Sequence, residues 1–216
     1  MSENRLRVDI WSDIACPWCY IGKRRFESAL KLVDFAEDVE VHWHAYQLDP
    51  SLPEHYHGTE QEYLSTVKAM DPQQVAGMLA HVTEQAAAEG LAYDFDRVQP
   101  ANSFSALRLL EFAKQRGAGD AMKESLLAAH FVQGANVGDH DTLVQLATEI
   151  GLDPQDAAAA LADGSYTDEV NADIAQAQQL GISGVPFFVL QGKYGISGAQ
   201  PAEAFAQALR TVHAEL

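Results

Sequence analysis

The chain has 216 residues, of which 47% are hydrophobic, so it can bury a sizeable core and is not expected to be disordered. Its 31 acidic and 14 basic residues give a net charge of −17, which argues against duplex nucleic acid or an anionic membrane surface as the main partner. The first residues carry no apolar run typical of a signal peptide, and no apolar segment of about 18 residues follows. These features predict a cytoplasmic protein that binds neither nucleic acid nor membrane.

The only two cysteines of the chain lie in the segment Cys16-Pro17-Trp18-Cys19. A strand-like stretch, Leu6 to Trp11, precedes them, and helical periodicity begins at Cys16. The unpaired N–H groups and the positive dipole end of that helix favour an anion. We therefore predict that Cys16 has a lowered pKa and is the attacking thiolate, and that Cys19, one turn further on, is the buried resolving thiol.

Other uses of a cysteine pair fit this sequence less well. A zinc site would use Cys16 and Cys19 as half of a tetrahedral ligand set, but no second cysteine pair or HxxxH motif follows. A structural disulfide across four residues would restrain little of the unfolded chain. Disulfides are rare in a reducing compartment, so the pair is predicted to be redox-active, with Pro17 in the first helical turn and Trp18 covering the thiols.

After the first helix, Val39 to Leu48 alternates apolar and polar residues and predicts a half-buried strand, followed by a loop from Ser51 to Gly58. A long region of helices comes next, most of them bounded by a capping residue and a closing glycine. The predicted helices are Asp71 to Gly90, Asn102 or Ser103 to Arg116, Asp141 to Ile150, Asp153 to Ala162, and Thr167 to Leu180.

The C-terminal part of the chain returns to β-structure. Pro186 to Leu190 and Lys193 to Ser197 predict two strands joined by a tight turn at Gln191-Gly192, and Pro201 opens a terminal helix. The order is therefore β-α-β, then helices, then β-β-α. It predicts an α/β fold in which residues 1–50 and 181–216 form one domain and residues 51–180 an inserted helical domain.

Four segments carry a family resemblance: Ser12 to Tyr20, Asn102 to Leu109, Gly184 to Phe188, and Ser197 to Pro201. Together they resemble the DsbA-like thioredoxin-fold family, and in particular its FrnE-type cytoplasmic branch. The likeness covers essentially the whole chain, including the helical stretch His130 to Asp139. It implies a thioredoxin fold with a large helical insertion.

The resemblance also implies how substrate is held. The Val185–Pro186 bond is expected to be cis, so that the backbone of Val185 presents itself to an extended substrate segment beside Cys16. Proline is the residue type whose cis bond costs least. We expect Pro17, Trp18, Val185 and Pro186 to be the substrate-binding residues.

We expect a protein disulfide oxidoreductase that exchanges disulfides through Cys16 and Cys19 with thiol- or disulfide-containing proteins or small molecules. In a reducing cytosol the pair would rest mostly reduced, which favours isomerase or reductase work over net oxidation. Asp13 is a candidate relay for the proton of Cys19, although a cap or loop hydrogen bond is the commoner role of such an aspartate. No cofactor or metal is expected, glutathione is a candidate redox partner, and the chain is expected to be a monomer or homodimer.

Two other functions stay open. The architecture also resembles the kappa-class glutathione transferases and the 2-hydroxychromene-2-carboxylate isomerases, in which glutathione supplies the thiol and a serine stands near the position of Cys16. Those relatives tend to carry Ser-Asp where this chain has Ala199-Gln200. A thiol-dependent holdase chaperone would use Trp18, Tyr20 and Ile21 as exposed apolar residues, although packing beneath the insertion is the commoner fate of such residues.

Two polar clusters are candidates for ligand binding. Lys23, Arg24 and Arg25 follow the thiols on the helix and are either a site for the carboxylates of a small thiol or an acidic protein segment, or a solvated helix face. Four histidines from a strand face and a loop are either a metal site or polar surface residues: His42, His44, His55 and His57.

Overall fold

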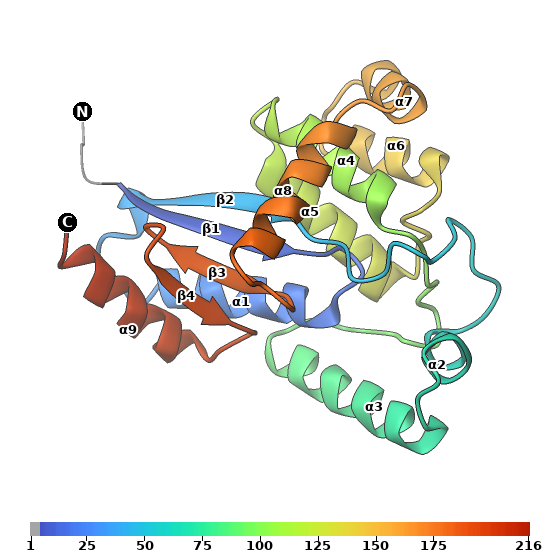
Figure 1. The fold of residues 1–216 in the computed structure, drawn as a ribbon, viewed down its shortest axis with the longest axis horizontal. Coiled ribbons are helices and arrows are strands. Elements are labelled where there is room, and N and C mark those ends of the chain that lie inside the picture. The colour runs from blue at the N-terminus through green and yellow to red at the C-terminus, as the bar shows by residue number, and fades with distance from the viewer. Residues whose placement is uncertain (1–4) are drawn as a thin grey trace.

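The computed structural model describes residues 5–216, and Figure 1 shows their arrangement. Within them, one sheet has the strand order β2-β1-β3-β4, where β1 is Leu6–Ser12, β2 is Val39–Ala45, β3 is Phe187–Leu190 and β4 is Tyr194–Ser197. β1 and β2 pair in parallel, and the β3–β4 hairpin joins β1 in antiparallel orientation. This topology confirms the predicted thioredoxin fold.

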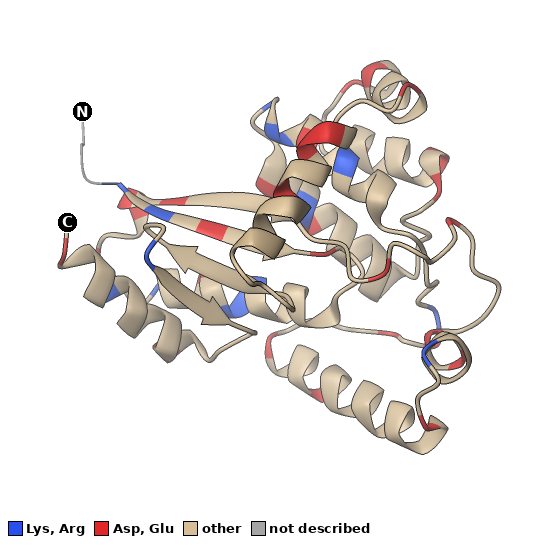
Figure 2. Ribbon diagram, in the orientation of Figure 1, with Lys and Arg blue, Asp and Glu red and all other residues tan. Residues whose placement is uncertain are grey.

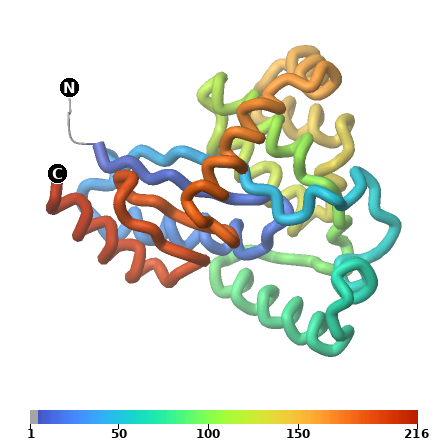
Figure 3. The backbone as a smooth tube through the Cα atoms, viewed as in Figure 1, coloured from blue at the N-terminus to red at the C-terminus, as the bar shows by residue number. Residues whose placement is uncertain are grey.

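The helical insertion divides into two parts in Figures 1 and 3, α2 with α3 on one side and the bundle of α4 to α7 on the other. In chain order the helices are α1 Pro17–Leu30, α2 Glu60–Glu62, α3 Pro72–Ala88, α4 Phe104–Lys114, α5 Gly119–Ala128, α6 His140–Glu149, α7 Pro154–Ala162, α8 Thr167–Gln179 and α9 Ala202–His213. α2 and α5 each continue into a π-helical turn, Tyr63–Val67 and Ala129–Gln133. Over residues 5–216, no helix is both long enough and apolar enough to span a membrane.

Different helices cover the two faces of the sheet. α1 and α9 lie on one face, where the rings of Phe26, Phe188 and Phe205 pack with centroids 4.5 to 5.7 Å apart. α8 covers the other face, where Trp11 of β1 packs with Ile182 just beyond the helix. Neighbouring strand residues point to opposite faces, so β1 contributes to both hydrophobic layers.

Capping residues explain where α3 and α7 begin. Asp71 and Asp153 accept hydrogen bonds from backbone N–H groups of the first turn, and a proline that needs no N–H partner follows each of them. Gln191 and Gly192 have φ values of 52° and 65°, as a two-residue hairpin turn requires. These local signals place the element ends within a few residues of the prediction.

Two predicted elements end earlier than expected, and the short helix α2 and helix α5 were not predicted. The strand expected to run to Leu48 ends at Ala45. The stretch His130 to Asp139, expected to be helical, is helical only to Gln133, because Gly134 has a φ of 70° and ends the turn. A Cβ at position 134 would lie 2.6 Å from the carbonyl oxygen of Arg97, so only glycine fits where the chain leaves the π-helical turn.

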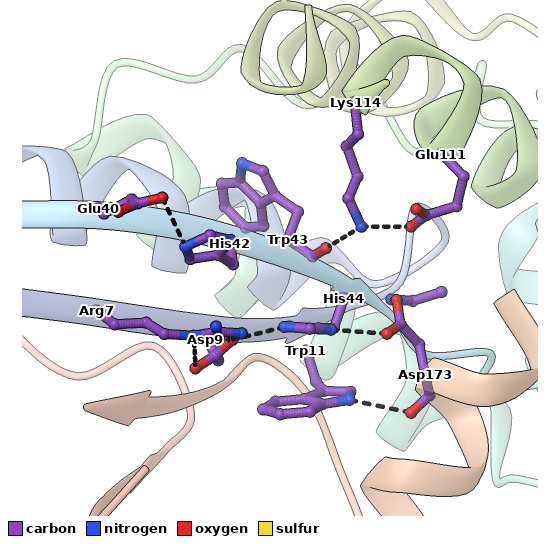
Figure 4. A network of polar contacts seen from close by, with 11 residues as sticks. Arg7, Asp9, Trp11, Glu40, His42, Trp43, His44, Glu111, Lys114 and Asp173 are labelled. Carbon is purple, nitrogen blue, oxygen red and sulfur yellow. Dashed lines mark hydrogen bonds and ion pairs between the residues drawn. The ribbon is translucent and has the colours of Figure 1, made fainter. Parts of the chain in front are cut away.

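A polar network ties α8 to the sheet (Figure 4). His44 of β2 lies between two carboxylates, with Nε2 2.7 Å from Asp9 and Nδ1 2.7 Å from Asp173 of α8. Trp11 stacks on His44, and its indole N–H donates to the carbonyl of Asp173. Burial alone would lower the pKa of His44, but the hydrogen bonds to Asp173 and Asp9 raise it above its ordinary value. The network thereby positions α8 and the loop that follows it.

We predict that the free energy of unfolding falls as pH rises above about 6.5 through the raised pKa of folded His44, because the imidazolium has its two carboxylate partners only in the folded state. The stabilisation by the His44 imidazolium is fully present below the unfolded-state pKa of about 6.5. Urea unfolding over about pH 5 to 9 measures how the free energy of unfolding changes with pH. His44→Gln should flatten this pH dependence, whereas His57→Gln, in an exposed loop, should not. Equal slopes in wild type and His44→Gln would contradict the prediction.

Candidate active site

The redox pair lies at the start of α1. Cys16 is the N-cap residue, with φ −98° and ψ 112°, and its side chain makes no capping hydrogen bond. Pro17 occupies the first helical position, and the N–H of Cys19 donates to the carbonyl of Cys16 at 3.0 Å. Both cysteines are free thiols, and only 4% of Cys16 and 1% of Cys19 is exposed. The two thiols therefore lie next to each other at the N-terminus of α1, where the protein shields them from solvent.

The loop before β3 completes the site. The Sγ of Cys16 donates to the carbonyl oxygen of Val185 at 3.3 Å. The Val185–Pro186 bond is cis, as the family resemblance implied. α1 can approach this loop because residue 22 is glycine: a Cβ there would lie 2.8 Å from Cγ of Pro186. The fold thus brings together both cysteines, Val185 and Pro186.

The two thiols are neighbours in a buried site, so the protonation state of one affects the pKa of the other. The neighbouring sulfur of Cys19 and burial both oppose ionisation of Cys16 and raise its pKa. Burial disfavours the thiolate of Cys19 as well, whereas the neighbouring Cys16, the positive charge of Lys123 and the hydroxyl of Ser12 favour it and lower its pKa. Burial and the neighbouring thiol therefore act against the helix dipole at Cys16, and the lowered pKa expected of Cys16 stays a prediction.

Two buried charged residues accompany the pair. Lys123 of α5 is fully buried, and its Nζ has no hydrogen-bond partner among the described residues. Desolvation lowers the pKa of Lys123 to about 8, against the attraction of Cys19 and Asp13. Asp13 accepts the backbone N–H groups of Leu48 and Ala15, at 2.7 and 3.3 Å, and burial raises its pKa. Lys123 was missed from the sequence because a helical lysine is normally solvated.

A cavity of about 380 Å³ opens over Cys16. Pro17, Trp18 and Val185 also line it, whereas Cys19 does not. Its other walls come from the two π-helical turns, α3 and the segment before α4. One sulfur of the pair therefore faces a space that a substrate can enter, and the other lies behind it.

The basic residues that follow the thiols bind carboxylates of this chain. Figure 2 shows acidic residues on many of the helices and loops. The prediction of a site for an external carboxylate is therefore wrong, and Lys23, with 3% exposed, is not solvated either. The partners are Glu27, Asp120 and Glu124 for Lys23, Glu27 and Glu124 for Arg24, and Glu89, Gln85 and the carbonyl of Ala199 for Arg25.

The histidines considered as metal ligands do not meet. His44 lies in the network of Figure 4, His42 lies 3.1 Å from Glu40, and a ring nitrogen of His55 lies 2.8 Å from the amide nitrogen of Asn136. Over residues 5–216, no group of three or more His, Cys, Asp and Glu side chains is arranged to hold a metal ion.

The apolar residues considered for holdase activity are mostly inside the protein. Tyr20 and Ile21 are 2% and 0% exposed and belong to a hydrophobic cluster that also contains Tyr93. Trp18 is half-buried and lies beside His81 of α3, with ring centroids 6.0 Å apart. The exposed apolar surface that this alternative requires of Tyr20 and Ile21 is absent.

The sheet, the CxxC pair at the start of α1 and the adjacent Val185–Pro186 loop define a thioredoxin-fold protein. The family model described as the DSBA-like thioredoxin domain matches residues 7–210, so the chain belongs to the DsbA-like thioredoxin family. A curated relative, the uncharacterized protein YwbO of Bacillus subtilis (strain 168), is 30% identical over 207 residues, which are 94% of this chain and 96% of YwbO.

Solved structures share the fold. A probable DsbA oxidoreductase from Streptomyces coelicolor is 43% identical, with a TM-score of 0.93, over 98% of this chain and 92% of that chain. The cytosolic disulfide reductase DsbM from Pseudomonas aeruginosa, solved with GSH, has 19% identity and a TM-score of 0.66 over 95% and 98% of the two chains. A 2-hydroxychromene-2-carboxylate isomerase has 15% identity and a TM-score of 0.66 over 95% of each chain.

We predict that Gly22→Ala impairs disulfide exchange and lowers the free energy of unfolding by about 1–3 kcal/mol, because the new methyl group overlaps Pro186 and overpacks the site. The matched control is Gly77→Ala on α3, where a Cβ meets no atom within 4 Å. In that variant the free energy of unfolding should rise by about 0.5–1 kcal/mol, and the disulfide-exchange activity should be unchanged. Urea unfolding and an insulin-reduction assay measure both effects, and equal behaviour of the two variants would refute the close packing.

We predict that Lys123→Met moves the thiolate titration of the reduced protein to higher pH, because it removes the positive charge that lowers the pKa of Cys19. Thiolate absorbance near 240 nm follows the titration. Lys31→Met, at an exposed position after α1, is the control and should leave the curve in place, and Lys123→Arg should largely preserve it. An unchanged midpoint in Lys123→Met would show that this lysine does not act on the pair.

Proposed function

We propose that this protein is a cytosolic thiol–disulfide oxidoreductase of the FrnE-type branch, working mainly as a reductase or isomerase through Cys16 and Cys19. The observation that carries the proposal is the asymmetry of the pair: Cys16 lines the cavity against the carbonyl of Val185, and Cys19 lies behind it near Lys123. An attacking thiol needs access, and a resolving thiol needs a proton acceptor.

The resting proton arrangement suits the first step. Cys16 carries the proton that the two sulfurs share, and its transfer to Cys19 produces a Cys16 thiolate at the N-terminus of α1, where unpaired N–H groups stabilise it. This thiolate attacks one sulfur of the substrate disulfide. A Cys16–substrate bond forms, the substrate S–S bond breaks, and one substrate thiolate leaves. The backbone of Val185 holds an extended substrate in line during this step.

Resolution requires Cys19 to lose its proton. Lys123, with a pKa of about 8, has a neutral fraction at physiological pH and no other hydrogen-bond partner among the described residues, so it can accept this proton. The Cys19 thiolate then attacks Cys16, the Cys16–Cys19 disulfide forms, and the second substrate thiolate leaves. The carboxylate of Asp13 already accepts two backbone N–H groups, so its part is to favour the charged lysine.

The direction of exchange follows from the compartment. A pair in a reducing cytosol is returned to the dithiol after each turnover, with a small thiol such as glutathione as the reductant. The likeness to a cytosolic disulfide reductase solved with GSH supports this choice, within the limits of a shared fold. Protein and small-molecule disulfides are both admissible substrates, and no resident cofactor or metal is proposed.

A glutathione-dependent isomerase remains the second candidate, because a solved 2-hydroxychromene-2-carboxylate isomerase shares the fold. Two features weigh against it. Cys16 is a reactive thiol where those enzymes carry a serine. The segment that would hold the γ-glutamyl group already makes hydrogen bonds within this chain. Arg25 donates to the carbonyl oxygen of Ala199, and the side-chain amide of Gln200 donates to the carbonyl oxygen of Ser197.

We predict that Cys16→Ser reduces insulin reduction and the reactivation of scrambled ribonuclease by roughly three orders of magnitude or more, because it removes the nucleophile. Cys19→Ser should block turnover after one mixed disulfide has formed. Ser28→Ala, on the outer part of α1, is the control and should retain wild-type rates. Unchanged activity of Cys16→Ser would remove Cys16 from the mechanism, and turnover of a chromene carboxylate without Cys19 would favour the isomerase.

A further inference from the structure

The cavity over Cys16 is mainly apolar. Its walls include Leu52 of the loop before α2, Tyr63 of the first π-helical turn, Leu79 and Val82 of α3, and Phe95 of the loop after α3. A volume of about 380 Å³ is within the range of small-molecule sites. α2 and α3 lie together on one side of the molecule, apart from the α4–α7 bundle (Figure 1). The space fits a small apolar body.

His130 is a polar group in this apolar cavity. It lies on the second π-helical turn, lines the cavity and is 2% exposed, and its Nδ1 has no hydrogen-bond partner among the described residues. Desolvation lowers the pKa of His130 to about 4, so the ring is neutral at physiological pH. Nδ1 itself is enclosed by protein beside the backbone of Ala135, so a ligand in the cavity can reach only the other edge of the ring. Nε2, on that edge, hydrogen bonds to no described residue, and a ligand can supply its partner. π-helical turns are themselves frequent at functional sites.

The charges that line the cavity argue for a neutral ligand. Lys68, the lysine that lines it in the described part of the chain, is paired with Asp49 at 2.7 Å. Glu60 lines the same space, and desolvation raises its pKa to about 7. A ligand carboxylate would therefore find carboxylates but no unpaired cation there. A neutral hydroxyl or carbonyl group matches a neutral imidazole.

We propose that the cavity is the substrate site for low-molecular-weight disulfides with a neutral aromatic or other apolar body, and that His130 selects those whose body carries a hydroxyl or carbonyl group. The proposal deepens the proposed function and rests on it, because the cavity places the disulfide of such a substrate beside Cys16. A small disulfide can enter the cavity and approach a thiol of which only 4% is exposed, whereas the bulk of a folded protein hinders such an approach.

The reaction balances with a thiol reductant. The reduced pair, which carries one proton on its two sulfurs, and one aryl disulfide give the Cys16–Cys19 disulfide, one aryl thiol and one aryl thiolate, and the proton reaches the product from Cys19 by way of Lys123. Two glutathione molecules then return the pair to the dithiol and form one oxidised glutathione. His130 takes no part in these bond changes and acts by binding the substrate.

The test compares two matched substrates, bis(4-hydroxyphenyl) disulfide and diphenyl disulfide, in the presence of glutathione and glutathione reductase. Wild type should prefer the hydroxylated compound by about tenfold in kcat/KM, and His130→Leu should lose that preference, because a buried polar group discriminates against a substrate that leaves it unpaired. His130→Gln, which keeps a neutral hydrogen-bonding group, should restore part of it. His213→Leu, on α9 away from the cavity, should behave as wild type.

A second measurement separates binding from chemistry. The redox-inactive analogue bis(4-hydroxyphenyl) sulfide should bind Cys16→Ser and raise its melting temperature, and it should bind the Cys16→Ser, His130→Leu double variant about tenfold more weakly. The melting temperature of His130→Leu shows whether the variant folds, and His213→Leu, on α9 away from the cavity, is the control that should keep the wild-type rate of insulin reduction.

The outcomes distinguish the two levels of the proposal. No binding of the sulfide, or equal selectivity in wild type and His130→Leu, with Cys16-dependent insulin reduction intact, would overturn the small-disulfide site and leave the proposed function standing. Loss of insulin reduction in His130→Leu with a normal melting temperature would also overturn it, by giving His130 a role in the exchange itself. Absence of Cys16-dependent reduction of every disulfide in wild type would refute the proposed function.

Discussion

The hydrogen bond from the thiol of Cys16 to the carbonyl of Val185 is the contact on which the site depends. It joins the N-terminus of α1 to the loop before β3, two segments from opposite ends of the sequence. Gly22 permits the approach, because a larger residue would meet Pro186. On the other face of the sheet, the network around His44 anchors α8, the helix from which that loop departs. The positions of attacking sulfur and substrate-binding backbone are therefore set together.

The same contact shapes the electrostatics of the reduced pair. An acceptor carbonyl and a neighbouring sulfur keep the proton on Cys16, while Lys123 and Ser12 favour the thiolate of Cys19. A substrate that competes for the Val185 backbone removes that acceptor, and the shared proton can then move to Cys19. Substrate binding and nucleophile activation are thus coupled in the proposed mechanism through one hydrogen bond.

The site also contains the most costly buried groups of the described structure. Lys123 and His130 both have a side-chain nitrogen without a partner, and both have pKa values lowered by desolvation. One lies behind the resolving thiol and the other lines the cavity. Buried polar groups without hydrogen-bond partners are rare in folded proteins, and both of these lie next to the CxxC pair or its cavity, which supports the proton transfer and ligand binding proposed for them.

Much of the fold was predictable because its signals are local. Alternation of apolar and polar residues marked the strand that begins at Val39, a tight turn marked the C-terminal hairpin, and Asp-Pro pairs marked the starts of α3 and α7. α5 was missed because it begins at Gly119 after Ala118, without a side-chain cap, and α2 is only three residues long. The CxxC pair and the residues around Pro186 could be named from motifs and the resemblance they carry.

The remaining parts of the site depend on packing between segments far apart in the chain. Nothing in the sequence distinguishes buried Lys123 from an exposed helical lysine, or His130 from a satisfied core histidine. Lys23 likewise follows the polar face of α1 in sequence, yet the approach of α5 buries it among carboxylates. The pKa values of the thiols also depend on groups that no local pattern reveals: the dipole is a property of one helix, but the carbonyl of Val185, Lys123 and the hydroxyl of Ser12 come from elsewhere in the chain.

The most direct test of the central claim is to identify which sulfur forms the mixed disulfide. Reduced Cys19→Ser and Cys16→Ser variants are each mixed with oxidised glutathione, quenched over time and analysed by mass spectrometry of the intact protein. The account predicts rapid accumulation of a single adduct at Cys16 in the first variant and a far slower reaction in the second. Equal or faster adduct formation at Cys19 would contradict it, because the sulfur behind the cavity would then be the nucleophile.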